Sequence, residues 1–132
     1  MKPSKLPRIS QTEWEIMDVV WTRGPMAAAG IIEALRATDA SWHPKTLGTM
    51  LNRLVRKGAI GFRKEGRGYE YYALVPREAC VAAESDSFLQ RLFGGSMKPM
   101  LAHMVESRKL SRREIAELRE ILDRNEDKKK KE

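Results

Sequence analysis

The hydrophobic pattern of this chain changes its period at Gly58, and this change constrains the fold more than any other feature of the sequence. Before Gly58, apolar residues recur at every third or fourth position, which is the spacing of one face of a helix. After it, Ile60 and Phe62 alternate with small or charged residues, and residues 69–74 are rich in strand formers. Glycines in residues 64–68 permit a tight turn. Helices followed by a β-hairpin are therefore predicted.

Two helices are predicted in the first 40 residues. Ser10 and Glu13 have the spacing of a capping box, and the Gly-Pro pair at residues 24–25 ends the helix that the box begins. A second apolar stripe, starting at Ala28, predicts a helix that fades over residues 38–40. We interpret both helices as the structural scaffold of the domain.

A third helix is predicted over residues 44–57. Pro44 suits its first turn, because the missing N–H has no partner there, and Gly58 suits a left-handed cap. One side of this helix is apolar and consists of Leu47, Met50, Leu51, Leu54 and Val55. The other side contains no acid and consists of Lys45, Thr46, Gly48, Thr49, Asn52, Arg53 and Arg56. Bases beside Thr and Asn are the side chains that meet phosphates and base edges of nucleic acid.

The positive charge of the chain is concentrated around this helix and the hairpin. The net charge of the whole chain is +7, and residues 41–68 hold seven Lys and Arg against one acid, a net +6. Such a patch inside a folded region is the electrostatic footprint of a nucleic-acid partner. We therefore predict a winged helix-turn-helix, with the third helix in the major groove and the hairpin on the flanking phosphates or minor groove. The predicted DNA-binding residues are Lys45, Thr46, Thr49, Asn52, Arg53, Arg56 and Arg67.

The remainder of the chain reads as helical. Pro76 opens a helix that ends at residues 94–95, and a second capping box, Ser111 with Glu114, begins the last one. The segment 76–124 is marginal for a core of its own, so we expect it to form a homodimer. The predicted dimerisation residues are Phe88, Leu92, Met97, Met100, Leu101, Met104, Ile115, Leu118 and Leu122.

The predicted fold class is mainly α with a small antiparallel β-wing. Residues 1–75 are assigned to the DNA-binding domain, residues 76–124 to the helical dimerisation domain, and residues 125–132 to a disordered basic tail. Two-fold symmetry would let a small module of this kind read two half-sites.

Several other classes of protein are excluded by what the sequence lacks. The single Cys80 cannot form an internal disulfide, and His43 and His103 are not paired at metal-ligand spacing, so no metal or cofactor is expected. No catalytic set and no phosphate-binding loop is found, which disfavours an enzyme. The chain has no run of about 20 apolar residues and no apolar signal-peptide core. We therefore expect a cytoplasmic protein without membrane insertion.

The order of residues resembles the penicillinase repressor family, of the BlaI/MecI type, from about Ile9 to Leu122. The resemblance rests on Ser10-x-x-Glu13-Trp14-Glu15-Ile16-Met17 with Trp21, Trp42-His43-Pro44-Lys45-Thr46, Thr49-x-x-x-Arg53-Leu54-x-x-Lys57-Gly58, Tyr71-Tyr72-x-Leu74, and Gly94-Gly95 ahead of Leu110-Ser111. It implies a winged-helix domain, a helical dimerisation domain, and repression from palindromic operators. It also implies that Lys45, Thr46, Thr49 and Arg53 contact DNA. Gly48 departs from the pattern, because well-known members carry a basic residue there, so base preference is expected to differ.

The same resemblance implies release from DNA by proteolysis. A membrane-bound sensor metalloprotease cuts family members in the dimerisation domain, and the matching bond here joins His103 and Met104. Known targets of that protease resemble Asn-Phe at this place, and His103-Met104 departs from that pattern in both residues. The alternative to a repressor is a winged helix used as a protein-interaction or RNA-binding module. A protein-docking face would carry exposed aromatic or apolar anchors, which the polar face of the third helix lacks.

Overall fold

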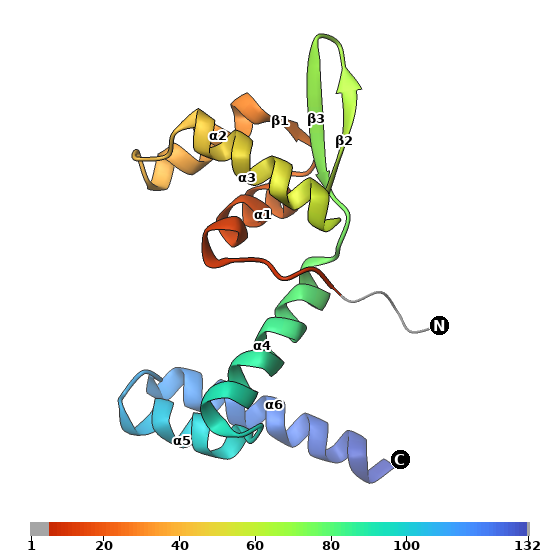
Figure 1. Cartoon of the computed structure of the whole chain (residues 1–132). Helices are drawn as coiled ribbons and strands as arrows, with labels where there is room; N and C mark the ends of the chain where they lie inside the picture. The colour runs from red at the N-terminus through yellow and green to blue at the C-terminus, as the bar shows by residue number, and fades with distance from the viewer. Residues whose placement is uncertain (1–5, 132) are drawn as a thin grey trace. The chain divides into compact units, whose positions relative to one another are not determined.

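The structure is a computed structural model that describes the backbone of residues 6–131 and the side chains of residues 6–128. The first five residues of the predicted DNA-binding domain and Glu132 lie outside the described residues. In chain order the elements are α1 (Gln11–Arg23), β1 (Met26–Ala27), α2 (Ala28–Thr38), α3 (Pro44–Lys57), β2 (Ile60–Glu65), β3 (Gly68–Ala73), α4 (Arg77–Phe93), α5 (Met97–Glu106) and α6 (Arg112–Lys131) (Figure 1). The fold is mainly helical with a small antiparallel sheet, which confirms the predicted fold class.

The chain divides into two compact units, and the division falls after Glu84, within α4. The sequence prediction had placed it at residue 76. The difference arises because the first turns of α4 belong to the first unit. There Cys80 is buried, and the Arg77 Nε lies 3.4 Å from Oδ1 of Asp18 on α1. In addition, Nε1 of Trp21 donates a 2.9 Å hydrogen bond to the carbonyl of Val75, just before the helix.

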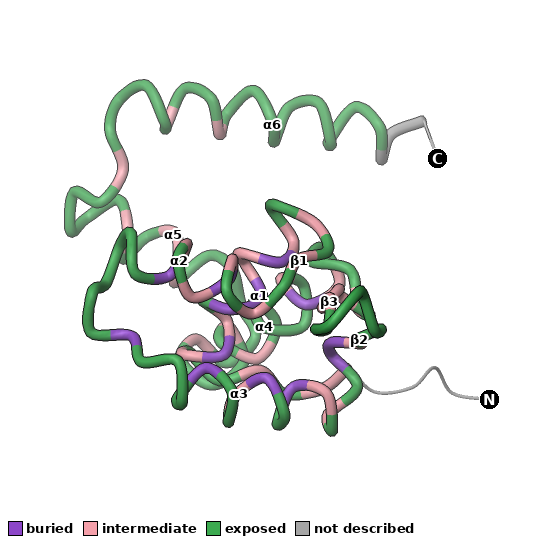
Figure 2. Tube along the Cα trace, turned by 90° about the horizontal axis from the view of Figure 1, so that it is seen from above, coloured by how far each residue is buried: buried purple, intermediate pink, exposed green. Residues whose placement is uncertain are grey.

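The core of the first unit lies where α1, α2, α3 and the start of the hairpin meet. Helix α3 contributes its predicted apolar side, of which Leu47, Leu51 and Leu54 are buried (Figure 2). The other buried hydrophobic residues packed in this core are Ile16, Met17, Val20, Ile31, Leu35, Trp42, Ala59 and Ile60. Because α3 is held by one side only, its opposite side is left at the surface.

Local signals determine the helix ends as predicted. At the start of α1, the backbone N–H of Glu13 donates to the Ser10 hydroxyl and the backbone N–H of Ser10 donates to Glu13 Oε1, which completes the capping box. Helix α3 starts at Pro44, and Gly58 closes it with φ 81° and ψ 15°, the left-handed cap that its sequence predicted. The second capping box also forms at Ser111.

The sheet has three antiparallel strands in the order β1-β3-β2. Strands β2 and β3 form the predicted hairpin, here called the wing, and their register pairs Glu65 with Gly68. The connecting turn is therefore only two residues long, with Gly66 at φ 61° in its first position, which L side chains rarely adopt. Strand β1 was not predicted, because two residues carry no periodic signal and are strand only through pairing with Tyr71 and Glu70.

The second unit contains α5, α6 and the end of α4. None of its described residues is buried, and the tube of α6 in Figure 2 is exposed along most of its length. The structure also differs from the sequence prediction at the end of this unit. Where a disordered tail was expected from residue 125, α6 continues to Lys131. Lys, Glu and Arg are good helix formers, and the Asn125 side chain donates a 2.8 Å hydrogen bond to the carbonyl of Ile121.

Candidate nucleic-acid interface

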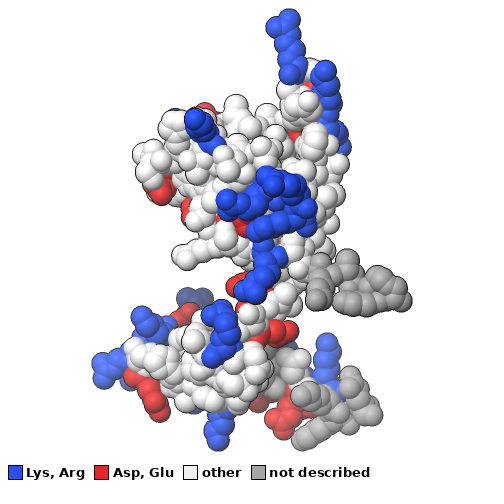
Figure 3. Space-filling view, in the orientation of Figure 1, with Lys and Arg blue, Asp and Glu red and all other residues white. Residues whose placement is uncertain are grey.

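The polar side of α3 is at the surface over its whole length. All seven residues of this side, Gly48 included, are exposed, and the predicted DNA-binding residues among them are Lys45, Thr46, Thr49, Asn52, Arg53 and Arg56. The space-filling view shows basic side chains gathered over α3 (Figure 3). The structure therefore brings together on one surface the helix residues that the sequence singled out.

The N-terminus of α3 is fixed by residues that the sequence analysis had not assigned. Trp42 is buried, and its carbonyl accepts a 2.8 Å hydrogen bond from Nε of Arg36 on α2. His43 is the N-cap residue, and its Nδ1 accepts the backbone N–H of Lys45 at 3.1 Å. The cap was missed because histidine is not among the preferred N-cap residues. Together these contacts hold the first turn of α3, where Lys45 and Thr46 lie.

Thr49 presents a restricted set of groups to a ligand. Its hydroxyl donates a 3.1 Å hydrogen bond to the carbonyl of Lys45, one turn earlier on α3. The proton is thereby used within the helix, while the oxygen lone pairs and the methyl group remain exposed. Thr49 is therefore suited to accept a hydrogen bond from a base amino group or to contact a thymine methyl.

Glu13 ties α3 to the start of α1 through two of the basic residues of α3. Its side chain is fully buried, and its Oε1 lies 2.6 Å from the Lys57 ammonium, which also donates to the carbonyl of Arg8 at 2.7 Å. The other oxygen, Oε2, lies 3.7 Å from Nη1 of Arg53 and accepts no hydrogen bond. The Arg53 side chain is 49% exposed. Arg53 is thus held only loosely by Glu13, and the rest of its side chain is open to a ligand.

The contacts with Lys57 and Ser10 keep the Glu13 carboxyl ionised although it is buried. Burial by itself would raise the pKa of the Glu13 carboxyl, but the hydrogen bond from Lys57, the backbone N–H of Ser10 and the charge of Lys57 together lower the pKa below its usual value. A fixed negative charge therefore lies beneath the C-terminal half of α3, next to Arg53 and Lys57. It offsets part of the charge of Lys57 and Arg53 and defines where they sit.

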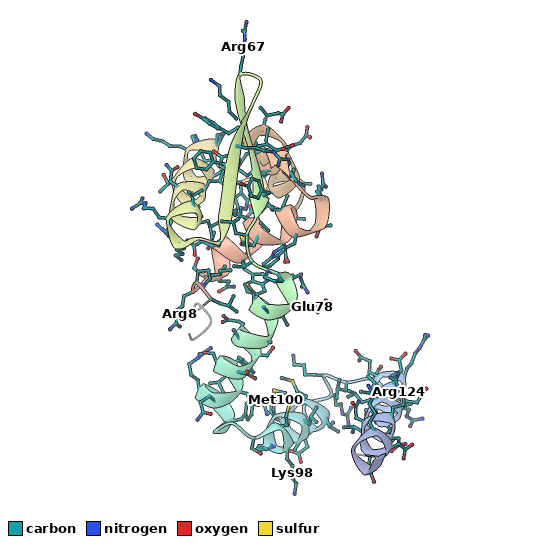
Figure 4. All side chains as sticks on the ribbon, turned by 90° about the vertical axis from the view of Figure 1, so that its right-hand side faces the viewer. Arg8, Arg67, Glu78, Lys98, Met100 and Arg124 are labelled. Carbon is teal, nitrogen blue, oxygen red and sulfur yellow. The ribbon has the colours of Figure 1, made fainter. Side chains whose placement is uncertain are left out.

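The wing carries its own pair of opposite charges. Nη2 of Arg63 lies 2.6 Å from Oε1 of Glu70, directly across the hairpin, and this pairing raises the pKa of the Arg63 guanidinium. Arg67 occupies the second position of the turn, and its side chain extends away from the wing tip (Figure 4). Arg67 is therefore placed as the sequence predicted, at the outermost point of the hairpin.

The basic patch is smaller than the sequence count indicated. Three of its seven bases, Arg53, Lys57 and Arg63, pair with Glu13 or Glu70, both of which lie outside residues 41–68. In the part of the chain that the structure describes, the other four form no ion pair: Lys45, Arg56, Lys64 and Arg67. These four are available to a polyanion in full, and Arg53, which shares the single carboxylate of Glu13 with Lys57, also remains open to a ligand.

Gly48 leaves a gap at one edge of the polar side of α3. A Cβ built at this position meets no heavy atom within 4 Å, so packing inside the chain does not require glycine there. Glycine costs a helix interior about 1 kcal/mol relative to alanine. What it provides is empty space on the exposed side, beside Lys45 and Asn52, which lie three and four residues away on the helix.

The predicted dimerisation residues form apolar surface that the single chain leaves uncovered. Leu92, Met97 and Leu122 are each 58% exposed and Phe88 is 36% exposed. Five others are half-buried: Met100, Leu101, Met104, Ile115 and Leu118. An open apolar hollow on α5 is lined by residues that include Met97, Leu101 and Val105.

The His103–Met104 bond lies inside α5, and its carbonyl is engaged. The His103 oxygen accepts the Ser107 backbone N–H at 2.9 Å and the Ser107 hydroxyl at 2.7 Å. The His103 ring also lies 6.4 Å from the ring of Phe93. A protease would have to open this turn of helix before it could reach the bond.

Other kinds of site find no support in the described residues. No group of three His, Cys, Asp or Glu side chains among them could hold a metal ion, and no helix among them is both long and apolar enough to cross a membrane. Burial raises the pKa of the Cys80 thiol, which keeps it in its unreactive protonated form.

Comparison with known proteins gives a family match over most of the chain. The profile of a family described as penicillinase repressor matches residues 9–124. The penicillinase repressor of Bacillus licheniformis is 37% identical over 126 residues, covering 96% of this chain and 98% of that protein. The methicillin resistance regulatory protein MecI of Mammaliicoccus sciuri is 34% identical over 121 residues, covering 92% and 98%.

Among solved structures, the DNA-binding domain of the repressor BlaI matches with a TM-score of 0.51 and 39% identity, covering 56% of this chain and 89% of that domain. These findings confirm the family resemblance and the winged-helix fold class drawn from the sequence. They also confirm the prediction of a regulator rather than an enzyme, because the matching proteins are repressors.

Proposed function

The chain belongs to the penicillinase repressor family, and from this premise we propose that it is a homodimeric repressor that binds inverted-repeat operators. Each copy would insert the polar side of α3 into the major groove of one half-site and place Arg67 on the flanking backbone. The repressor would act in the cytoplasm, where DNA is accessible to it.

The observation that carries this proposal is the exposed, acid-free side of α3. A solvated amphipathic helix normally mixes acids and bases, whereas every charge on this side is positive. Lys45 and Arg56 suit phosphates, and Thr49 and Asn52 suit base edges. The side also lacks the aromatic or apolar anchors that a protein-docking helix would present.

The uncovered apolar surface of the second unit supports the dimer. Exposed apolar patches of this kind mark contact surfaces in soluble proteins. A second copy of the same surface is self-complementary under two-fold symmetry, and the same symmetry sets two copies of α3 against two half-sites. Joining two weak modules in this way multiplies the affinity by mass action rather than by new contacts.

Selection of genomic DNA fragments by the purified full chain tests the proposal. We expect the recovered duplexes to share an inverted repeat and the footprint to be symmetric about its centre. Recovery of no common duplex motif, or a preference for single-stranded RNA over duplex DNA, would contradict the repressor function. The second outcome would favour the RNA-binding alternative.

We further propose that cleavage at His103–Met104 would release the repressor from DNA. The cut would separate Met97 and Leu101 from the apolar residues of α6, so that the dimer surface loses one of its parts. Because the bond lies within a helical turn closed by Ser107, Ser107→Ala is expected to speed cleavage by a sensor protease. Electrophoresis and mass spectrometry of the digest would locate the cut, and a first cut elsewhere would contradict this assignment.

A further inference from the structure

The two faces of the wing have different chemistry. Alternation along the strands puts Arg63, Glu65, Glu70 and Tyr72 on one face. There the Arg63 guanidinium pairs with Glu70 at 2.6 Å and lies 5.4 Å from the centre of the Tyr72 ring. Both acids of the wing fall on this face, and its charge is largely satisfied within the hairpin.

The other face of the wing is aromatic and contains no acid. Phe62 pairs with Tyr71 across the hairpin, and Lys64 pairs with Tyr69. The Phe62 ring lies 5.4 Å from the Tyr69 ring in an edge-to-face arrangement and 6.2 Å from the Tyr71 ring. Phe62 and Tyr69 remain 48% exposed, so the fold assembles an aromatic cluster and leaves it open.

This face does not stand alone, because it forms a hollow with α3. The hollow has a volume of about 220 Å³ and is lined by Asn52, Val55, Phe62, Tyr69 and Tyr71; we call it the aromatic hollow. Its α3 wall is continuous with the acid-free side of that helix, since Asn52 belongs to both. Arg56 follows Asn52 by one helical turn and Lys64 adjoins Tyr69, so that unpaired bases flank the hollow.

We propose that the aromatic hollow receives the deoxyribose edge of a DNA strand where the strand passes between α3 and the wing. In a duplex the faces of the bases are stacked on each other, so the sugar C–H groups are the apolar surface that a strand offers next to its phosphates. The sugars would pack on Phe62 and Tyr69 while the adjoining phosphates meet Arg56 and Lys64. This inference rests on the proposed function and adds to it an apolar, sequence-independent anchor.

Charge favours a DNA strand over another occupant. One strand alternates apolar sugars and anionic phosphates at short intervals, which matches aromatic rings flanked by bases. An apolar protein segment would satisfy the rings and leave the flanking bases without partners. The anchor also differs from a phosphate contact in a measurable way, because apolar packing releases no counterions and does not depend on salt.

The test compares alanine substitutions on the two faces of the wing in the full chain. Phe62→Ala and Tyr69→Ala alter the aromatic hollow, and Tyr72→Ala is the matched control on the opposite face. Tyr72 is more buried than Tyr69, so its loss disturbs the hairpin at least as much. Binding is measured at several salt concentrations to the inverted-repeat duplex recovered by selection, to a mixed-sequence duplex and to the corresponding single strand, and thermal unfolding reports the fold.

We expect Phe62→Ala and Tyr69→Ala each to weaken binding to both duplexes roughly tenfold without changing the salt dependence. Tyr72→Ala should bind as the parent chain does. Unchanged duplex affinity in the two hollow variants, an equal loss in Tyr72→Ala, a changed salt dependence, or a loss confined to the single strand would each overturn the inference. If the parent chain itself fails to bind duplex DNA, the proposed function fails first, and the two failures are thereby distinguished.

Discussion

Every buried side chain in the described residues belongs to the first unit, and the second unit has none, although both are built largely from amphipathic helices. In the first unit the apolar sides of α1, α2 and α3 face one another around residues such as Ile31 and Leu54. In the second, Leu92, Met97 and Leu122 stay more than half exposed. The apolar helix faces are therefore buried against one another within the single chain in the first unit, whereas in the second unit they remain exposed.

If the chain forms the proposed homodimer, this difference means that the two units are stabilised by different means. Burial inside one copy contributes a free energy of unfolding that does not depend on concentration. A surface completed by a second copy contributes a stability that rises with protein concentration by mass action. Under the proposed dimerisation, the DNA-binding unit would remain folded whether or not the chain dimerises, whereas the second unit would gain its core from the second copy.

The largest effect is expected from removing most of the second unit. A chain ending at His103 should keep the winged-helix fold, fail to dimerise, and lose roughly 10²–10⁴-fold in operator affinity, because each copy then binds one half-site alone. Sedimentation and gel-shift measurements beside the full chain would check this. A stable dimer that lacks residues 104–132 and still binds the operator tightly would contradict the conclusion that the second unit is needed for dimerisation.

A pair of leucines separates the two kinds of stability. Leu54→Ala removes a fully buried side chain of the first unit and should cost about 2–5 kcal/mol of unfolding free energy at any protein concentration. Leu118→Ala, in the half-buried stripe of α6, should instead shift the concentration at which the dimer dissociates. Urea unfolding over a range of protein concentrations would check both. Equal concentration dependence in the two variants would contradict the comparison.

Glu13 gives the first unit a sensitivity to pH. Its pKa is lowered in the folded chain, so the stability it contributes is fully present above its ordinary pKa of 4.5 and is lost as the pH falls through the lowered value. Glu13→Gln keeps an acceptor for Ser10 but removes the charge facing Lys57, and should cost about 1.5–3 kcal/mol at neutral pH.

Unfolding at a series of pH values measures this contribution. The parent chain and Glu13→Gln should converge in stability as the pH drops well below 4.5, because both then lack the carboxylate charge. Glu114→Gln is the matched control. Ser111 and Glu114 form the same capping box in the second unit, but Glu114 is exposed and is not part of a buried ion pair such as that of Glu13 with Lys57. A constant difference between parent and Glu13→Gln at all pH values would exclude the charge as the cause.

The smallest effects concern binding alone. Thr49→Ala or Arg53→Ala should relax discrimination between operators by about 1 kcal/mol or more, and Arg67→Ala should weaken binding to all sequences and lower the salt slope by about 1. None should alter dimerisation, because all three residues lie in the first unit. Titrations at several salt concentrations would show the two patterns, and equal non-specific losses would count against base reading by α3.

Features with local causes were predictable from the sequence. Both ends of α3 follow from Pro44 and Gly58, and both capping boxes follow from Ser and Glu three residues apart. The exposure of the polar side of α3 follows from the spacing of its leucines. Each of these features depends on residues within a few helical turns of one another, and within that range the geometry of the helix determines which side chains are in contact.

Features that depend on distant residues were not predictable. Strand β1 exists through its pairing with β3, and the buried Glu13 engages Lys57, which lies 44 residues further along the chain. The reduction of the basic patch from seven free bases to four follows from such pairings. The aromatic hollow belongs to this group as well, since it joins Val55 of α3 to Tyr69 of the wing.

Hydrogen exchange of the full chain at two protein concentrations, one above and one below the point at which dimers dissociate, tests the central claim most directly. We expect amides of α1 and α3 to keep the same protection at both concentrations, and amides of α5 and α6 to lose protection on dilution. Protection of α5 and α6 that is strong and unchanged by dilution would show that the second unit holds its own structure without a second copy, and would contradict the account.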